Sequence, residues 1–365
     1  MNSVIFAYIQ KTNEMHAGIK FGIAGVIFAI VIAVSVFLQT PEIKPDISAV
    51  KNTDVLRIGY FPNINHAQAV IGVGNGDYQK TLGDIKLESQ VFNAGPSAIE
   101  ALFAKRIDVA YVGPNPAING YIKSDGNGLK IIGGVSSGGA VFVVRNDAGI
   151  HSVHDLSGKK FASPQLGNTQ DVALRSYVIK NGFKTTENGG NVTITPANSA
   201  DIVTMMSKKE LDGAWVPEPW GTILAKQTNS TILVDERDLW PNGKFATALI
   251  VARSDYLQNH PDVIQKLLQA HVQETLWINK NKADAINQFN TQVQKLTGKT
   301  MPNDVISEAF TRMDFTYDPI QSSVLKSADD AFNLGFLGEK KPDLSGIFDL
   351  SILNKVLQQQ NLPTV

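Results

Sequence analysis

The segment around Asn168 combines a predicted strand with a helix start that could bind an anion. Residues 159–162 form the strand, and after a polar turn a helix begins near Asn168, a residue type that caps helices. The first N–H groups of a helix have no acceptor within it and lie at the positive end of its dipole, so they can hold a negative charge. Asn168, Thr169 and Gln170 are therefore candidate ligand-binding residues. The same residues also suit a helix that is simply well capped, and the local sequence leaves both interpretations open.

Two other polar segments could contribute to a binding site. Asn115 lies between two prolines just after a predicted strand, where its amide could reach a ligand or serve only in a turn. Ser136, Ser137 and Gly138 place small side chains and backbone N–H groups in one predicted loop. Such a loop can cradle an anion, although a flexible turn has the same composition.

Three larger side chains are further candidates. His66 lies at the start of the first predicted helix and could donate a hydrogen bond to an oxyanion, or pack there as an ordinary residue. Glu218 could pair with an ammonium group of a ligand, and Trp220 could cover an alkyl chain or an amine. Alternatively, their Pro-Glu-Pro-Trp segment only braces the edge of a domain.

Several kinds of chemistry are not expected from this sequence. The chain has no cysteine, which excludes disulfides, thiolate metal sites and cysteine nucleophiles. His151 and His154 are three residues apart, but no further metal ligand lies nearby, so we expect no metal site. Neither a G-x-S-x-G motif nor a Walker loop is present. We therefore expect neither catalysis nor a cofactor.

Composition favours a globular protein that does not bind nucleic acid. The 365 residues are 43% hydrophobic and 18% charged, which suffices for one or two buried cores. The net charge is −1, whereas nucleic-acid-binding domains usually carry a basic excess or a basic stripe.

The N-terminal part predicts attachment to a membrane. Residues 21–38 are an uncharged apolar run, which as a helix would be about 27 Å long and match a bilayer core. No Ala-x-Ala cleavage site follows it. We expect residues 1–20 to be cytoplasmic, residues 21–38 to be a single transmembrane anchor and residues 39–54 to be a linker to an extracytoplasmic domain. A cleaved signal, which would give a secreted protein, is the alternative.

The remainder of the chain predicts two α/β lobes. Strands at 55–61, 85–92 and 107–112 alternate with amphipathic helices, which is typical of βαβ units and a mostly parallel sheet. The pattern apolar-Asp-x-Ala-aromatic-Val occurs at 107–112 and again at 211–216, each time before a proline-rich loop. This repetition indicates two similar lobes, whose loops at the carboxyl ends of strands would line a ligand crevice.

The order of elements suggests where the lobes begin and end. We expect residues 55–143 and 248–365 to form the first lobe and residues 144–247 the second, with a two-strand hinge near Val143 and Leu249. A long amphipathic helix at 261–279 and further helices at 303–313, 322–334 and 351–359 complete the first lobe.

Several motifs resemble a known family. GYFPNINHAQAVIG at 59–72, ASPQLGNTQDVALR at 162–175 and DGAWVPEPW at 212–220 are similar to the substrate-binding proteins of ABC importers. The similarity is to the aliphatic sulfonate, nitrate and taurine group, which shares its domain with proteins that make the pyrimidine precursor of thiamine. It extends from about residue 55 to residue 362. The fungal precursor enzymes carry a cysteine-rich motif, which this chain lacks.

The resemblance implies a fold and a function. It implies a two-lobed type II periplasmic binding protein, a monomer that closes on a small anionic or zwitterionic ligand and delivers it to an ABC permease with its ATPase. Asn168, Thr169 and Gln170 match the position that holds the anionic group. We expect an aliphatic sulfonate or taurine first, then nitrate, bicarbonate or a thiamine pyrimidine precursor. The alternative is an enzyme of the same fold that acts on a small organic acid or a pyrimidine precursor.

Overall fold

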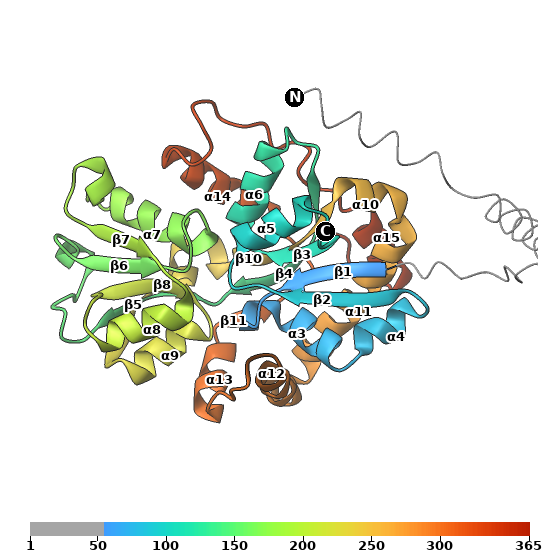
Figure 1. Cartoon of the computed structure of the whole chain (residues 1–365), viewed down its shortest axis with the longest axis horizontal. Helices are drawn as coiled ribbons and strands as arrows, with labels where there is room; N and C mark the ends of the chain where they lie inside the picture. Colours follow the sequence, from blue (N-terminus) through green and yellow to red (C-terminus); the bar gives the residue numbers. More distant parts are fainter. Residues whose placement is uncertain (1–54) are drawn as a thin grey trace, which may run out of the picture. The chain divides into compact units, whose positions relative to one another are not determined.

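The computed structural model describes residues 55–365, which belong to one compact unit. The expected anchor at 21–38 and linker at 39–54 lie outside the described residues. Between residues 55 and 365, no helix has the length and apolar character needed to cross a bilayer. The described chain folds into two lobes, each built on its own β-sheet (Figure 1).

The first lobe contains a six-stranded sheet in the order β11-β4-β10-β3-β1-β2. β1 pairs in parallel with both β2 and β3, as the βαβ pattern predicts, whereas β10 runs antiparallel to β3 and β4. The sheet is therefore mixed rather than mostly parallel. The strands are β1 (Val55–Tyr60), β2 (Lys86–Val91), β3 (Val109–Val112), β4 (Leu129–Gly138), β10 (Ala246–Arg253) and β11 (Met313–Phe315).

The second lobe contains a five-stranded sheet in the order β7-β6-β8-β5-β9. β6 is parallel to β7 and β8, and β5 is antiparallel to β8 and β9. The strands are β5 (Ala140–Arg145), β6 (Lys160–Ser163), β7 (Thr193–Pro196), β8 (Gly213–Pro217) and β9 (Ser230–Asp235).

The two sheets repeat one arrangement, and the repeated sequence pattern lies at its centre. β3 and β8 hold the two copies, and each pairs with one parallel and one antiparallel neighbour. The aspartate of the first copy, Asp108, accepts the backbone N–H of Arg57 in β1 at 2.9 Å and pairs with Arg253 at the end of β10 at 3.0 Å. The aspartate therefore joins three adjacent strands.

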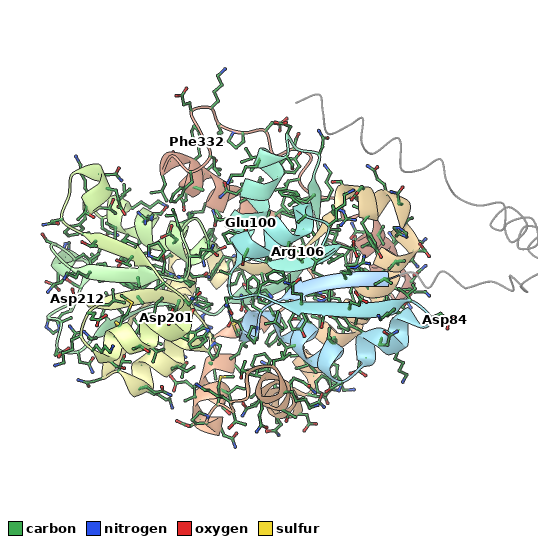
Figure 2. All side chains as sticks on the ribbon, in the orientation of Figure 1. Asp84, Glu100, Arg106, Asp201, Asp212 and Phe332 are labelled. Atoms are coloured by element: carbon green, nitrogen blue, oxygen red, sulfur yellow. The ribbon has the colours of Figure 1, made fainter. Side chains whose placement is uncertain are left out.

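Asp212 has the same role in the second copy. It accepts the N–H of Lys160 at the start of β6 at 2.8 Å and pairs with Arg145 at the end of β5 at 3.3 Å. It lies at the end of the second sheet that points away from the first lobe (Figure 2). The repetition predicted from sequence thus has a physical basis, because a carboxylate at this place satisfies a strand N–H group and an arginine together.

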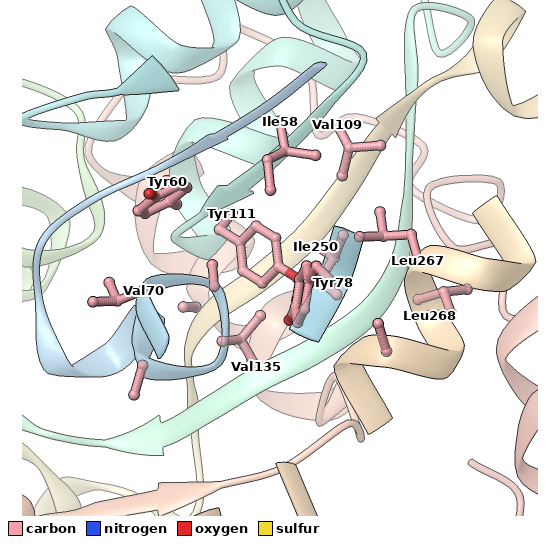
Figure 3. Packing of buried hydrophobic residues seen from close by; sticks show 14 of the residues in the cluster. Ile58, Tyr60, Val70, Tyr78, Val109, Tyr111, Val135, Ile250, Leu267 and Leu268 are labelled. Carbon is pink, nitrogen blue, oxygen red and sulfur yellow. The ribbon is translucent and has the colours of Figure 1, made fainter. Parts of the chain in front are cut away.

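Helices cover both faces of each sheet, because alternate strand residues point to opposite faces. In β5, Phe142 and Val144 belong to the core on the α7 side, while Val141 and Val143 belong to the core that contains side chains of α8 and α9. Figure 3 shows the corresponding packing in the first lobe, where Val109, Tyr111 and Ile250 of the sheet lie near Leu267 and Leu268.

In the first lobe, one face of the sheet packs against α3 (Ala67–Gly74), α4 (Asp77–Leu82), α10 (Ser254–Asn259), α11 (Pro261–Lys280), α12 (Lys282–Thr297), α13 (Asn303–Phe310) and α15 (Ser351–Gln359). The other face packs against α5 (Gly95–Phe103), α6 (Pro114–Lys123) and α14 (Gln321–Asn333). In the second lobe the helices are α7 (Thr169–Lys180), α8 (Ser199–Ser207) and α9 (Trp220–Gln227).

The chain crosses between the sheets at Gly138 and Gly139 and again between residues 236 and 245. Both glycines have positive φ, of +78° and +70°, a conformation that side chains other than glycine rarely adopt. The crossings therefore differ from those expected near Val143 and Leu249. Val143 is buried inside β5 of the second sheet and Leu249 inside β10 of the first, so neither residue can form the connection.

Replacing Asp108 by alanine should destabilise the first lobe. The change leaves the partly buried N–H of Arg57 without its acceptor and Arg253 with only Asp255 as a carboxylate partner. We expect the free energy of unfolding to fall by about 3 kcal/mol in chemical denaturation. Glu100→Ala, an exposed change on α5 (Figure 2), is the control and should change it by less than about 0.5 kcal/mol. Equal stability of the two variants would contradict this role for Asp108.

Candidate functional site

A small cavity lies between the two lobes at the carboxyl ends of the parallel strands. About 30 Å³ of it is open to the centres of water molecules. Its walls come from the segments that follow β1, β2 and β3 in the first lobe and β6, β7 and β8 in the second. The lining residues are Phe61, Asn63, Asn65, His66, Asn93, Ala94, Gly95, Gly113, Pro116, Pro164, Asn168, Thr169, Gln170, Ser199, Pro217 and Thr247.

The start of α7 is held rigidly beside this cavity. Asp171 is fully buried and accepts hydrogen bonds from Gly167 N at 2.9 Å, Ser163 Oγ at 2.7 Å and Arg175 Nε at 3.0 Å. Asn168 caps the helix as predicted, because its Oδ1 accepts the N–H of Asp171 at 2.9 Å. The N–H groups of Thr169 and Gln170 have no acceptor within the helix and lie at its positive end.

Other helices also begin at the cavity. Gly95 is the first residue of α5, Gly113 caps α6 and Ser199 is the first residue of α8, and all three line the walls. The positive ends of these helix dipoles therefore add to that of α7. No charged side chain is among the described residues that line the cavity. The arrangement favours a negatively charged ligand that is held by dipoles and neutral hydrogen-bond donors rather than by a salt bridge.

Polar atoms from both lobes remain without partners here. Asn65 Oδ1 and both ring nitrogens of His66 in the first lobe, and Thr169 Oγ1 in the second, are buried and have no hydrogen-bond partner within residues 55–365. A buried polar atom without a partner costs about 1–3 kcal/mol. These atoms are therefore suited to contact a ligand that touches both lobes.

His66 is uncharged in this environment. Its ring is fully buried and lies against the ring of Phe61, with the ring centres 4.4 Å apart. Burial lowers the pKa of His66 to about 3, because the charged imidazolium would lose its hydration. At neutral pH the ring therefore offers one N–H donor and one bare nitrogen acceptor.

Six of the ten predicted site residues do not line this cavity, and four of these six belong to the first lobe. Asn115 is buried in α6, where its side chain accepts from Ser327 Oγ at 2.7 Å and donates to the Ser327 carbonyl. Ser136, Ser137 and Gly138 lie in β4 rather than in a loop. The hydroxyl of Ser136 donates to the Asn65 carbonyl at 2.9 Å, and that of Ser137 accepts from Phe245 N at 3.1 Å. These groups satisfy the fold instead of facing the cavity.

Glu218 and Trp220 join the lobes instead of lining the cavity. Glu218 is fully buried; its carboxylate accepts from Thr222 N at 3.0 Å and from Arg312 of the first lobe at 3.1 Å. Trp220 donates its indole N–H to Asn63 Oδ1 of the first lobe at 3.0 Å. The bracing interpretation of this segment therefore describes it better than contact with an ammonium group.

Several lining residues were not predicted from the sequence. Asn65, Asn93 and Ser199 each follow a strand that ends at the cavity. They could have been identified from the rule that loops at the carboxyl ends of strands line the ligand crevice. Thr247 lies near the start of β10, an antiparallel strand, and no sequence signal marked it. Of the predicted residues, His66, Asn168, Thr169 and Gln170 do line the cavity.

A larger cavity of about 510 Å³ lies along the side of α7. Trp215, Trp240 and Phe245 form part of its walls, and the carboxylate of Glu236 accepts both indole N–H groups, at 2.7 and 3.2 Å. Burial raises the pKa of Glu236 to about 7. We place the candidate site in the smaller cavity, because only there do strand ends, helix starts and unpartnered atoms of both lobes meet.

Within residues 55–365, no group of three or more histidines and acidic residues could hold a metal ion. His151 and His154 are both exposed.

Comparisons with known proteins agree with this architecture. A sequence model of the NMT1-like family matches residues 49–289. The chain is 26% identical over 226 residues to a protein of Brucella abortus (strain 2308) that is named as a binding protein. The aligned region covers 61% of this chain and 66% of that protein. It is 25% identical over 335 residues to a protein of Escherichia coli (strain K12) that is named as an aliphatic sulfonates-binding protein, covering 89% of this chain and 94% of that one.

Solved structures share the fold. The alkanesulfonate-binding protein SsuA of Xanthomonas axonopodis pv. citri, bound to MOPS, superposes with a TM-score of 0.66 at 20% identity and covers 78% of this chain and 94% of its own. The periplasmic nitrate-binding protein NrtA of Synechocystis PCC 6803 superposes with a TM-score of 0.71 at 14% identity. The superposition covers 86% of this chain and 90% of NrtA. At these identities the likeness establishes the two-lobed fold.

Replacing Gly113 by alanine should prevent the lobes from closing fully. The φ angle of Gly113 is −71°, a value that any residue can adopt. A Cβ added at this position would nevertheless overlap Thr169 Oγ1 of the other lobe. We expect at least about tenfold weaker ligand binding, equal to about 1.4 kcal/mol, with little change in the melting temperature of the free protein. Gly133→Ala is the control, since its Cβ would have nearest neighbours at 3.6 Å. Unchanged affinity in Gly113→Ala would mean that binding does not need this close approach.

The buried neutral His66 should make the protein less stable in acid. Between its ordinary pKa of 6.5 and its pKa of about 3 in the folded protein, only the unfolded chain binds the proton, so stability is lost as the pH falls through this range. From pH 7 to pH 5 the wild type should lose about 2 kcal/mol more than His66→Phe does in chemical denaturation. His151→Phe, at an exposed histidine, should lose as much as the wild type. Parallel curves for the wild type and His66→Phe would show that the folded protein protonates His66.

Proposed function

This chain belongs to the NMT1-like family, and from that premise we propose that it is the solute-binding component of an ABC importer, which captures a small oxyanion between its lobes and delivers it to a permease. The observation that carries the proposal is the cavity in which unpartnered buried atoms of both lobes meet the starts of several helices. Relatives named for aliphatic sulfonates and for taurine support an oxyanion of this kind.

Ligand binding would stabilise the closed arrangement of the lobes. The ligand contacts Asn65 and His66 on one side and Thr169 on the other, and only the closed lobes offer all of these contacts together. A ligand shifts such an equilibrium by the difference between its affinities for the two states. Ion pairs between the lobes, Arg312 to Glu218 at 3.1 Å and Lys180 to Asp330 at 2.6 Å, favour the same closed state.

Among small oxyanions, a zwitterion such as taurine fits the lining of the cavity poorly. Glu218, the carboxylate expected to pair with a ligand ammonium, is already paired with Arg312 and does not line the cavity. A buried ammonium without a negatively charged partner is strongly unfavourable. Simple sulfonates, nitrate and other monoanions are therefore the better candidates, and a pyrimidine precursor is the uncharged alternative.

We propose further that the domain acts outside the cytoplasm as a monomer. The apolar run at 21–38 would anchor it to the cell membrane, or be removed as a signal to give a secreted protein. An ABC permease and its ATPase would be its partners. No nucleic acid, metal or cofactor has a role in this function, and the protein would release its ligand unchanged.

A thermal-shift screen of the full chain in mild detergent tests the proposal. The ligands are methanesulfonate, methylphosphonate, nitrate, bicarbonate, taurine and an aminopyrimidine. A ligand present at one hundred times its Kd should stabilise the protein by about 2.7 kcal/mol and raise the melting temperature. The double variant Thr169→Ala/Gln170→Ala should melt like the wild type but show a smaller ligand-induced shift, because it keeps the backbone N–H groups of the helix start and lacks the Thr169 hydroxyl and the Gln170 amide. An undiminished shift in this variant would remove these two side chains from the binding site, and the absence of any shift in the wild type would count against the whole class of ligands.

A further inference from the structure

The cavity between the lobes contains hydrogen-bond acceptors as well as donors. The N–H groups at the start of α7 and the hydroxyl of Thr169 can donate to the oxygens of a ligand. Facing them from the first lobe are Asn65 and His66, and Asn65 Oδ1 accepts hydrogen bonds only. Because all of these groups are buried, each needs a complementary group from the ligand.

His66 requires a donor whichever tautomer it adopts. A neutral imidazole protonates only one of its nitrogens, and the other is a bare acceptor. Neither nitrogen has a partner in the part of the chain that the structure describes. The neighbouring rings of Phe61 and Tyr111, with centres 4.4 and 6.4 Å from that of His66, cover the imidazole with apolar surface. The described residues supply no hydrogen for the bare nitrogen, which leaves a molecule bound in the cavity as its source.

Oxyanions differ in whether they can supply this hydrogen. Nitrate and alkanesulfonates carry only acceptor oxygens, so they would place lone pairs against Asn65 Oδ1 and the bare nitrogen of His66. Leaving such buried acceptors unsatisfied costs about 1–3 kcal/mol each. A monoanion that keeps one hydroxyl can direct its charged oxygens to the start of α7 and donate its single O–H group to the bare nitrogen of His66. Asn65 Oδ1 receives no hydrogen from either kind of anion, so it does not distinguish them.

We propose that this cleft selects a small oxyanion that retains one O–H group, of the hydrogen phosphonate type, over a hydrogen-free oxyanion of the same shape and charge. The inference rests on the proposed function and narrows its class of ligand. His66 is the residue that determines this specificity, because its bare nitrogen receives the ligand's hydrogen. The start of α7 supplies the affinity for negative charge that both kinds of anion share.

Methylphosphonate and methanesulfonate form the matched pair that tests this inference. At pH 6 the first is mainly a monoanion with one O–H group, and the second is a monoanion of nearly the same shape without one. We expect the full chain to bind methylphosphonate at least about tenfold more tightly in titration calorimetry, because a site built for a hydroxyl rejects the analogue that lacks it. Raising the pH until methylphosphonate loses its last proton should abolish the preference.

Variants of His66 separate this role from general damage to the fold. His66→Phe keeps an aromatic ring against Phe61 but removes the acceptor, so the two affinities should become equal to within about twofold. His66→Gln restores one donor and one acceptor and should recover part of the preference. His151→Phe, at an exposed histidine, should keep all of it. Melting curves of the free proteins identify any variant that fails to fold.

Other outcomes distinguish failure of this inference from failure of the proposed function. If methanesulfonate binds as tightly as methylphosphonate, the function stands and the inference is wrong. The inference is equally wrong if methanesulfonate binds with uptake of one proton, measured in buffers of different ionisation enthalpy, because His66 would then supply the hydrogen itself. If neither anion binds and no other ligand of the screen does, the proposed function fails as well.

Discussion

Closure of the two lobes buries polar atoms for which the described chain provides no partner, and this constraint organises the site. Asn65 and His66 approach from the first lobe and Thr169 from the second, and the three side chains leave four atoms unsatisfied. Glu218, which does not line the cavity, is by contrast paired with Thr222 and Arg312. The unpartnered atoms are therefore the place where the proposed ligand would supply the missing hydrogen-bond partners.

The repeated sheet explains why these atoms meet. In each lobe three parallel strands end at the cleft, and the loops that follow them lead into helices whose N-termini point to it. Asp108 and Asp212 hold the opposite ends of these strands in equivalent ways. The two lobes thus present the same kind of surface to the cavity, rich in backbone N–H groups and without charged side chains among the described lining residues. Such a surface attracts anions through dipoles that are already oriented before the ligand arrives.

Charged and neutral side chains occupy different places around the cleft. The charged residues of the interface, including Arg312, Lys180 and Asp330, pair with each other outside the cavity and stabilise the closed arrangement. The cavity itself holds neutral groups, whose hydrogen-bond directions can distinguish ligands of equal charge. Charge would then govern closure and hydrogen bonding would govern selectivity. In the proposed role such a separation would favour release of the ligand, because a buried salt bridge to the ligand would be costly to break.

The sequence by itself determined where several helices and strands of the protein lie along the chain. Hydrophobic periodicity and capping residues predicted the helix that begins after Asn168 and the long helix now seen as α11, because these signals depend on neighbours a few residues away. The duplication of β3 and β8 was predicted from a short sequence pattern that occurs twice. The sequence also pointed to His66, Thr169 and Gln170, since loops at the carboxyl ends of strands line the crevice of such folds.

Only the tertiary structure decided which polar residues are free to bind. Asn115 resembles a ligand-binding residue in sequence, but Ser327, 212 residues further along the chain, occupies its amide. The carboxylate of Glu218 is likewise occupied by Arg312. Ser136 and Ser137, expected in a loop, belong to β4 because β10 and β11 pair with that strand. Whether a polar group faces a ligand or another residue is settled by distant partners, and a local pattern contains no record of them.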